Sequence, residues 1–375
     1  MLGFVSLLMD ISSELIHSLL PVFLVSVLGA SAFTVGLIEG IAEAAALIVK
    51  VFSGTFSDYL GRRKALAVIG YSLGALSKPL FAIAPSTSMV FVARFVDRVG
   101  KGVRGAPRDA LVADLAPPQV RGAAYGLRQS LDTVGAFIGP LLAVGLMLLW
   151  SDDIRAAFRV AIIPGVLAVA LLCFGVQEPP RHRREKPVNP IHWRELRRLS
   201  KTYWRIVATG SVFTLARFSE AFLVLRAQQG GLPMAWVPLV LVTMNLIYAA
   251  SAYPFGRLSD SMSHSKLLVL GLAVLLGADL VLGYARSWEM AILGVALWGL
   301  HMGITQGLLA AMVANTSPHD LRGTAFGFFN LLCGFTMLVS NALAGLLWER
   351  LGPAFTFHAG AFFCALALTA MLLKL

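Results

Sequence analysis

Charged residues are scarce in this chain of 375 residues, where Asp, Glu, Lys and Arg together make up 14%. A soluble domain carries about 25% charged residues, so this composition excludes a soluble enzyme or binding module. Cysteine is equally scarce, and Cys173, Cys333 and Cys364 all lie in apolar segments without CxxC or Cys/His spacing. We therefore expect neither a disulfide nor a metal site.

Catalytic and nucleotide-binding motifs are also missing. The sequence contains no GxSxG or HExxH pattern, and Gly100-Lys101-Gly102 is not part of a GxxxxGK[ST] loop that follows a strand. We expect no nucleotide, no cofactor and no enzymatic activity. A membrane-embedded enzyme would depend on the few acidic and His residues of the first apolar segment, and we regard it as the less favoured interpretation.

Long apolar runs dominate what is present. Hydrophobic residues make up 57% of the chain and the mean hydropathy is +0.77. Because one membrane span takes about 20 residues, twelve spans with short loops use the whole length and leave no soluble domain. The first run has no cleavage-site pattern, so we interpret it as a span and not as a signal peptide. The pattern predicts an all-α membrane protein with helices at about 2–28, 32–57, 64–84, 87–113, 121–150, 157–177, 202–227, 232–258, 266–285, 288–315, 322–349 and 353–374.

One long polar segment, 178–201, separates six expected spans in 1–177 from six in 202–375. It is rich in Arg and Lys, and its second part has the pattern of a short amphipathic helix at the membrane surface. The net charge of +11 lies mostly there and in the turns at 62–64, 121, 266 and 322. Since basic loops stay on the cytoplasmic side, we expect an inner-membrane protein with both termini cytoplasmic and no nucleic-acid partner.

The two halves share an internal repeat. The sequence RGAAYG at 121–126 recurs as RGTAFG at 322–327, and Gly54 and Asp58 recur at almost the same offset as Gly256 and Asp260. Repeated six-span halves place the working site at their interface near the membrane midplane and allow the halves to rock around it.

At these residues the chain resembles the major facilitator superfamily of secondary transporters. Residues 54–64, GTFSDYLGRRK, match its GxxxDxxGR[KR][RK] signature, and the second-half copy keeps only Gly256 and Asp260. Residues 135–140, GAFIGP, are similar to an element of proton-coupled antiporters. Arg94-Phe95 matches the start of the family's RFxxGxG pattern only in part, because Arg98 replaces its first glycine. The resemblance covers the whole chain and implies two pseudo-symmetric six-helix bundles.

The resemblance also implies a cytoplasmic gate, in which Asp58 and Arg62 close the cytoplasmic side. The alternative is that the basic run only sets the topology. Gly135, Gly139 and Pro140 allow close helix packing and a bend. The expected gate residues are Gly54, Asp58, Gly61, Arg62, Arg63, Gly256 and Asp260.

The segment 89–114 is helix-length and apolar, yet it carries eight charged residues that must face protein or water rather than lipid. On the first span, Asp10, Glu14 and His17 share one face, and we expect them to carry protons; an ion pair that only fixes packing is the alternative. We expect the substrate cavity to include Arg94, Asp97, Arg98, Lys101, Arg217, Glu220, His301 and Gln306. We expect buried ion pairs among Glu39, Glu43, Arg104, Arg108, Asp109, Arg128 and Asp132.

The sequence thus predicts a proton-coupled secondary transporter of a small organic solute, with export favoured by the element at 135–140. A rival hypothesis is transport of an anionic solute or metal chelate along the arginines of segment 89–114, which nearby carboxylates would oppose. A lipid-binding receptor or scaffold without flux is the non-transport alternative. The expected partners are substrate, protons and the lipid bilayer, and the protein is expected to act as a monomer.

Overall fold

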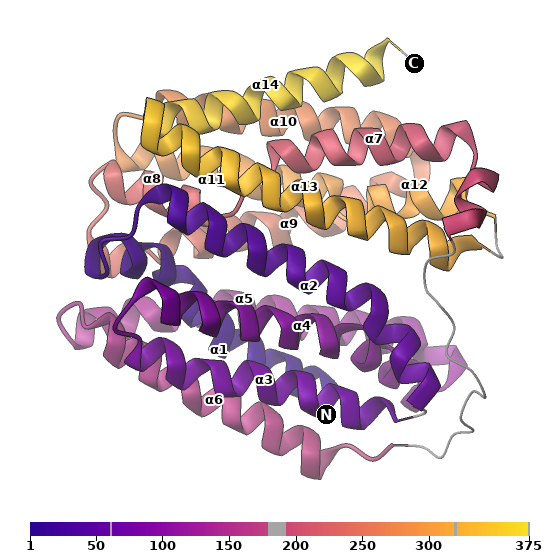
Figure 1. Cartoon of the computed structure of the whole chain (residues 1–375), viewed down its shortest axis with the longest axis horizontal. Helices are drawn as coiled ribbons and strands as arrows, with labels where there is room; N and C mark the ends of the chain where they lie inside the picture. Colours follow the sequence, from indigo (N-terminus) through magenta and orange to yellow (C-terminus); the bar gives the residue numbers. More distant parts are fainter. Residues whose placement is uncertain (61, 179–192, 319–320, 374–375) are drawn as a thin grey trace. The chain divides into compact units, whose positions relative to one another are not determined.

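The structure is a computed structural model that describes residues 1–60, 62–178, 193–318 and 321–373 (Figure 1). The side chains at 55, 58, 118, 193–195 and 260 are not described, nor is Gly61. Within the described part the regular elements are helices, and no strand occurs.

The first six membrane-length segments are close to their expected bounds. The first ends in a π-helical turn, η1, and a short 3-10 helix, η2, precedes the fifth. The elements are α1 Leu2–Val22, η1 Phe23–Val27, α2 Ala32–Leu60, α3 Arg63–Ile83, α4 Thr87–Leu115, η2 Pro118–Val120, α5 Arg121–Leu149 and α6 Ile154–Gly175.

The last six segments also match, but two of them are interrupted. The expected helix at 202–227 is split at 217–220, and the one at 288–315 is split at 306–307. The short amphipathic helix expected late in 178–201 is a 3-10 helix, η3, while 179–192 lie outside the described residues. The elements are η3 Trp193–Arg198, α7 Lys201–Ala216, α8 Ala221–Gln229, η4 Met234–Trp236, α9 Leu239–Ser261, α10 His264–Tyr284, α11 Trp288–Thr305, α12 Leu308–Thr316, α13 Arg322–Leu351 and α14 Pro353–Leu372.

Eleven of these segments in the described chain are long and apolar enough to cross a membrane. The twelfth, α4, has the length of 29 residues but carries the charged residues noted above. Large apolar side chains such as Phe174, Leu149 and Phe362 are exposed on the helix surfaces, as expected for groups that face lipid. The predicted all-α membrane fold is confirmed.

Local sequence explains where several helices begin and end. The side chains of Ser86, Asp153 and Ser200 each accept a hydrogen bond from a backbone N–H in the first turn of α4, α6 and α7. Between α13 and α14, Gly352 takes a φ of 103° and Pro353 follows as the first helical residue. A glycine tolerates this backbone conformation, and proline is preorganised for a helix start, so the sharp turn follows from the sequence.

Backbone contacts divide the chain into two compact units. The first contains 1–29, 41–190 and 234–238, and the second contains 30–40, 191–233 and 239–375. Compared with the expected halves, residues 30–40 cluster with the second unit and residues 234–238 with the first. The expected domain boundaries at 177 and 202 stay a prediction.

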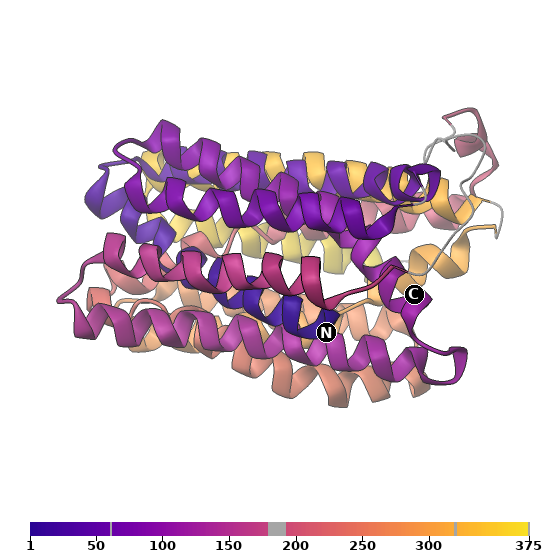
Figure 2. The same cartoon turned by 90° about the horizontal axis from the view of Figure 1, so that it is seen from below.

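Each unit has its own packed helices. In the first unit α1 packs on α5 and α6, and α3 runs alongside α4 in both views (Figures 1 and 2). A core that includes Met9, Tyr71 and Leu172 joins these helices. In the second unit α10 packs on α11 and α14, and Tyr203, Val313 and Phe329 form part of a separate core.

Candidate functional site

The buried charges of the first unit form a connected cluster on α4. Lys78 of α3 reaches across to Asp97, with Nζ 2.7 Å from Oδ1, and the same ammonium donates to the hydroxyl of Ser13 at 2.9 Å. Both Lys78 and Asp97 are almost fully buried. Arg104, one of the expected ion-pair residues, places its guanidinium 4.9 Å from the centre of the Tyr71 ring. These contacts satisfy charges that would otherwise be costly inside an apolar bundle.

A second pair links α4 to α2. Arg98 Nε lies 3.1 Å from Glu43 Oε1, and Arg94 Nη2 lies 3.9 Å from the same oxygen. Lys101 is close enough to Glu43 and Glu14 to interact with both electrostatically. The structure therefore places the expected helix-4 cations beside acidic partners. Glu39, one turn before Glu43 on α2, belongs to the second unit, where its Oε2 lies 3.4 Å from the hydroxyl of Ser219.

On α1 the structure brings Glu14 and His17 together. His17 Nδ1 is 3.3 Å from Glu14 Oε2, and both side chains are largely buried. Asp10, one turn earlier, lies within electrostatic reach of Asp132 and Lys101. The three residues that the helical spacing placed on one face thus point to the same charged interior of the first unit.

Charged side chains late in α4 and in the first half of α5 form a network. Arg128 Nη1 is 2.6 Å from Asp132 Oδ2, and Arg108 Nη2 is 3.1 Å from Asp109 Oδ1. Longer contacts of 3.8 and 3.9 Å cross-link the two pairs. Tyr125 donates a hydrogen bond of 2.7 Å to the backbone oxygen of Asp109. The arrangement holds the ends of α4 and α5 together.

One of the expected gate residues, Arg63, lies beside acidic groups. Arg63 Nη1 donates to Asp114 of α4 at 2.6 Å and to the backbone oxygen of Ala110 at 3.0 Å. The carboxylate of Glu178 accepts the backbone N–H groups of Arg63 and Lys64, which are the first of α3. A carboxylate at a helix N-terminus is favourable.

The remaining gate residues are less informative. Arg62 precedes α3 as its N-cap residue, and Gly54 packs near Ala106 of α4. Gly256 has open space on the side where a Cβ would stand. The side chains of Asp58 and Asp260, and Gly61 as a whole, lie outside the described residues. The expected cytoplasmic gate of Asp58 and Arg62 therefore stays a prediction.

The glycines of α5 permit the close contact with α1. A Cβ on Gly135 would stand 2.8 Å from the backbone oxygen of Leu7, and one on Gly139 would stand 2.9 Å from that of Ile11. Pro140 lies inside the same helix. Only glycine fits at these two positions without separating the helices.

The second unit contains a cavity of about 300 Å³ beside both helix interruptions. Arg217 and Gln306, two of the expected cavity residues, line it together with Phe213, Tyr248 and Met302. His301 does not line the cavity but lies behind it, fully buried, with its ring centre 6.3 Å from that of Phe213. Glu220 precedes α8, in the same interruption as Arg217.

The break between α7 and α8 is held by α13. Ser340 donates to the backbone oxygen of Leu215 at 2.9 Å, and Asn341 Oδ1 accepts the N–H of Ser219 at 2.6 Å. These two buried side chains satisfy backbone groups that the interrupted helix leaves free. The sequence 217–220 contains neither proline nor glycine, so reasoning from the sequence missed the break.

Two further buried charged residues were missed. Lys78 and Asp279 each stand alone in an apolar span, and this isolation is the signal that could have identified them. Asp279 of α10 is fully buried against Gly360 of α14, and neither carboxylate oxygen has a hydrogen-bond partner in the described part of the chain.

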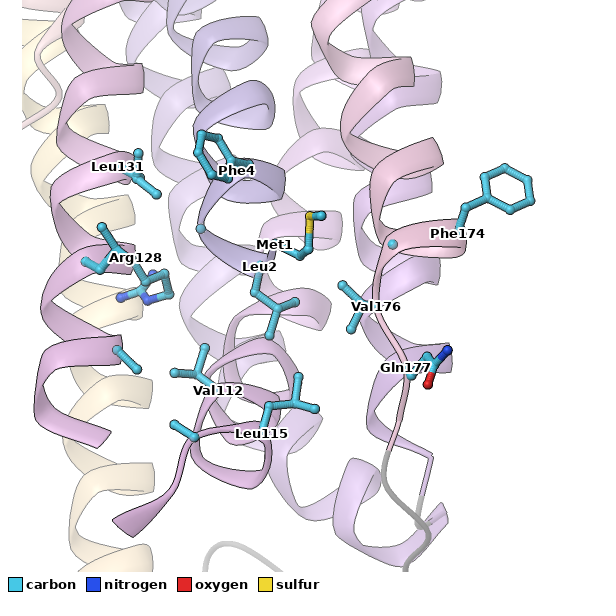
Figure 3. Close-up of a pocket in the computed structure, with 15 residues that line it drawn as sticks. Met1, Leu2, Phe4, Val112, Leu115, Arg128, Leu131, Phe174, Val176 and Gln177 are labelled. Atoms are coloured by element: carbon cyan, nitrogen blue, oxygen red, sulfur yellow. The ribbon is translucent and has the colours of Figure 1, made fainter. Parts of the chain in front are cut away.

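A separate cavity of about 510 Å³ lies in the first unit where α1 begins and α6 ends (Figure 3). Its lining is mostly apolar, with side chains such as Leu2, Val112 and Leu131, while Arg128 lies at one side. Phe174 points away from it. Arg128 is already paired with Asp132, and Gln177 is the other polar side chain of the lining.

Membrane-length helices with charged side chains buried among them define a multi-pass membrane protein. A profile of the Major Facilitator Superfamily matches residues 2–245 and 227–375, so the chain belongs to that family. The protein is a transporter and not an enzyme, and the resemblance noted from the sequence is confirmed.

Relatives and solved structures cover nearly the whole chain. The MFS-type transporter MJ1317 of Methanocaldococcus jannaschii is 32% identical over 367 residues, which cover 96% of this chain and 90% of that protein. The multidrug resistance protein MdtH of Cronobacter sakazakii is 23% identical over 337 residues, or 89% and 82% of the two chains. The crystal structure of the nucleoside transporter NupG matches 99% of this chain and 98% of its own with a TM-score of 0.83 at 12% identity.

Proposed function

We propose that this transporter exports a small organic solute across the inner membrane by alternating access, in exchange for protons. The observation that carries the proposal is the Glu14–His17 pair, 3.3 Å apart on α1 inside the charged interior of the first unit. Protonatable groups at such a depth are costly to keep and are typical of proton pathways. Lys101 and Arg98 lie within electrostatic reach of Glu14, so a proton taken up there weakens its attraction to both cations.

Export is supported by two further features. The glycine and proline element of α5 packs directly on α1, where a Cβ at Gly139 would also meet Glu14 Cβ at 3.0 Å. The expected proton carrier Glu14 therefore lies next to the glycine and proline element that packs α5 against α1. Among the relatives, MdtH is named a multidrug resistance protein, which favours the outward direction.

The rival route for anions along α4 receives less support. Asp97, Glu43, Asp109 and Asp132 stand next to the α4 cations and offset their charge. Paired cations attract an anionic solute weakly, because the carboxylate already occupies the favourable position. The proposal keeps Asp58 and Arg62 as the cytoplasmic gate and adds the Arg63–Asp114 pair to it.

Reconstituted vesicles test the proposal. Purified protein in liposomes with a pH-sensitive dye inside should show proton movement when a transported solute is added on one side, and a pH gradient should drive the solute against its own gradient. Empty liposomes and protein in the presence of a protonophore are the controls. Solute uptake that proceeds at the same rate with and without the pH gradient would contradict proton coupling while leaving transport intact.

A further inference from the structure

Two interrupted helical segments of the second unit meet at one cavity of about 300 Å³. The end of α7 supplies Phe213 and Arg217, α9 supplies Tyr248, and the α11–α12 junction supplies Gln306, Gly307 and Leu309. All of these residues belong to the second unit, so the cavity is complete within it. Concave sites of this size with a few convergent polar groups are where small ligands bind.

Arg217 is the one charged side chain among the lining residues of this cavity. Its guanidinium lies 5.6 Å from the centre of the Phe213 ring, and within the described chain it has none of the carboxylate contacts that hold Arg98 and Arg128. Glu220 is near enough to act on Arg217 electrostatically, but it does not line the cavity. The cationic head of Arg217 is therefore available to a ligand in a way that those of Arg98 and Arg128 are not.

The backbone adds to this positive character. Gly307 has a φ of 72° and caps α12, and no side chain caps the first N–H groups of that helix. Unsatisfied N–H groups at a helix start carry partial positive charge and attract anions. At the end of α7 the situation is the reverse, because Ser340 donates to the oxygen of Leu215 and reduces the exposed negative charge there. The start of α12 thus favours an anion in the cavity, while the Ser340 hydrogen bond lowers the repulsion that the end of α7 would exert on one.

The rest of the lining is suited to an apolar or aromatic body. The rings of Phe213 and Tyr248 and the thioether of Met302 line the cavity, with the amide of Gln306 as a further polar group. Guanidinium groups bind carboxylates with two parallel hydrogen bonds, and aromatic rings provide stacking surfaces. We propose that this cavity binds the carboxylate of a small aromatic organic anion, with Arg217 as its main contact. This inference rests on the proposed function and assigns its substrate class.

Three probes of similar shape, one anionic, one neutral and one cationic, test this proposal. Indole-3-acetate, indole-3-acetamide and tryptamine are titrated into detergent-purified protein at pH 7 without any gradient, and binding is followed by calorimetry and thermal unfolding. We expect indole-3-acetate to bind at least about tenfold more tightly than the amide or the amine, since a bidentate charge-assisted pair is lost in both. Arg217→Gln should remove this preference, and Arg217→Lys should restore part of it.

Arg205→Gln is the matched control, because Arg205 is an exposed residue on the same helix. It should bind indole-3-acetate like the unaltered protein. Equal binding of all three probes, tighter binding of tryptamine, absence of binding by indole-3-acetate, or an acetate preference that survives Arg217→Gln would each overturn the proposal. Gradient-driven flux is measured separately in vesicles: anion binding without proton-coupled flux contradicts the proposed function alone, whereas coupled flux of tryptamine with no role for Arg217 contradicts this inference alone.

Discussion

Lys78 Nζ and Asp97 Oδ1 lie 2.7 Å apart and join α3 to α4 in an ion pair with almost no exposure to solvent. Such a pair contributes little net stability compared with apolar residues of the same size, but the loss of one partner leaves a buried charge behind. Arg98 Nε, 4.0 Å from Asp97 Oδ2, is the nearest remaining cation and compensates only in part.

We therefore expect Lys78→Met to destabilise the protein by about 3–5 kcal/mol and to lower the thermal unfolding temperature. The double variant Lys78→Met with Asp97→Leu should recover most of that loss, because no uncompensated charge remains. Thermal unfolding of four proteins in one detergent, namely the unaltered protein, Lys78→Met, Asp97→Leu and the double variant, measures the coupling. If the double variant is as unstable as the sum of the single variants, the ion pair does not exist as described.

The α1–α5 contact predicts opposite effects for two glycines of one helix. Gly139→Ala should destabilise the protein by about 1–3 kcal/mol, since the new methyl group would meet the backbone of Ile11. At Gly145 a Cβ meets nothing within 4 Å, so Gly145→Ala should be neutral or stabilise by about 0.5–1 kcal/mol through the lower chain entropy. Apparent unfolding temperatures compare the two, and equal effects would argue against the close packing.

Glu14→Gln tests the proton step without a change in side-chain shape. We expect solute flux driven by a pH gradient to fall by at least about tenfold, because a neutral amide cannot carry the proton. Solute binding without a gradient should be largely retained. Glu289→Gln makes the same chemical change at an exposed position in the first turn of α11 and should leave flux unchanged. Retained gradient-driven flux in Glu14→Gln would move the proton site elsewhere.

We expect Asp279→Asn and Asp97→Asn to change the stability of the protein in opposite directions. The carboxylate oxygens of Asp279 have no hydrogen-bond partner in the described chain. Asp279→Asn leaves a polar group there but removes the possibility of an uncompensated negative charge, so it should stabilise the protein by about 1 kcal/mol at pH 8. Asp97→Asn should destabilise it, because Lys78 then loses its partner. A loss of flux in Asp279→Asn, with normal stability, would instead assign Asp279 a role in transport.

The sequence by itself determined the class of fold, the number of membrane-length segments and most of their bounds. These features follow from lengths of apolar sequence, which the bilayer thickness fixes, and from capping and turn residues that act locally. It also indicated which charges share a helical face, since Asp10, Glu14 and His17 need only the helical period for that.

The tertiary structure decided the partners. For each basic residue the sequence leaves several acidic residues as possible partners. Only helix packing selects Asp97 for Lys78 and Glu43 for Arg98. It also decided the interruption after α7, because the backbone groups freed there are satisfied by Ser340 and Asn341, which lie more than a hundred residues away in sequence. A contact over such a distance has no local signal, so the cavity beside Arg217 became visible only once the chain was folded.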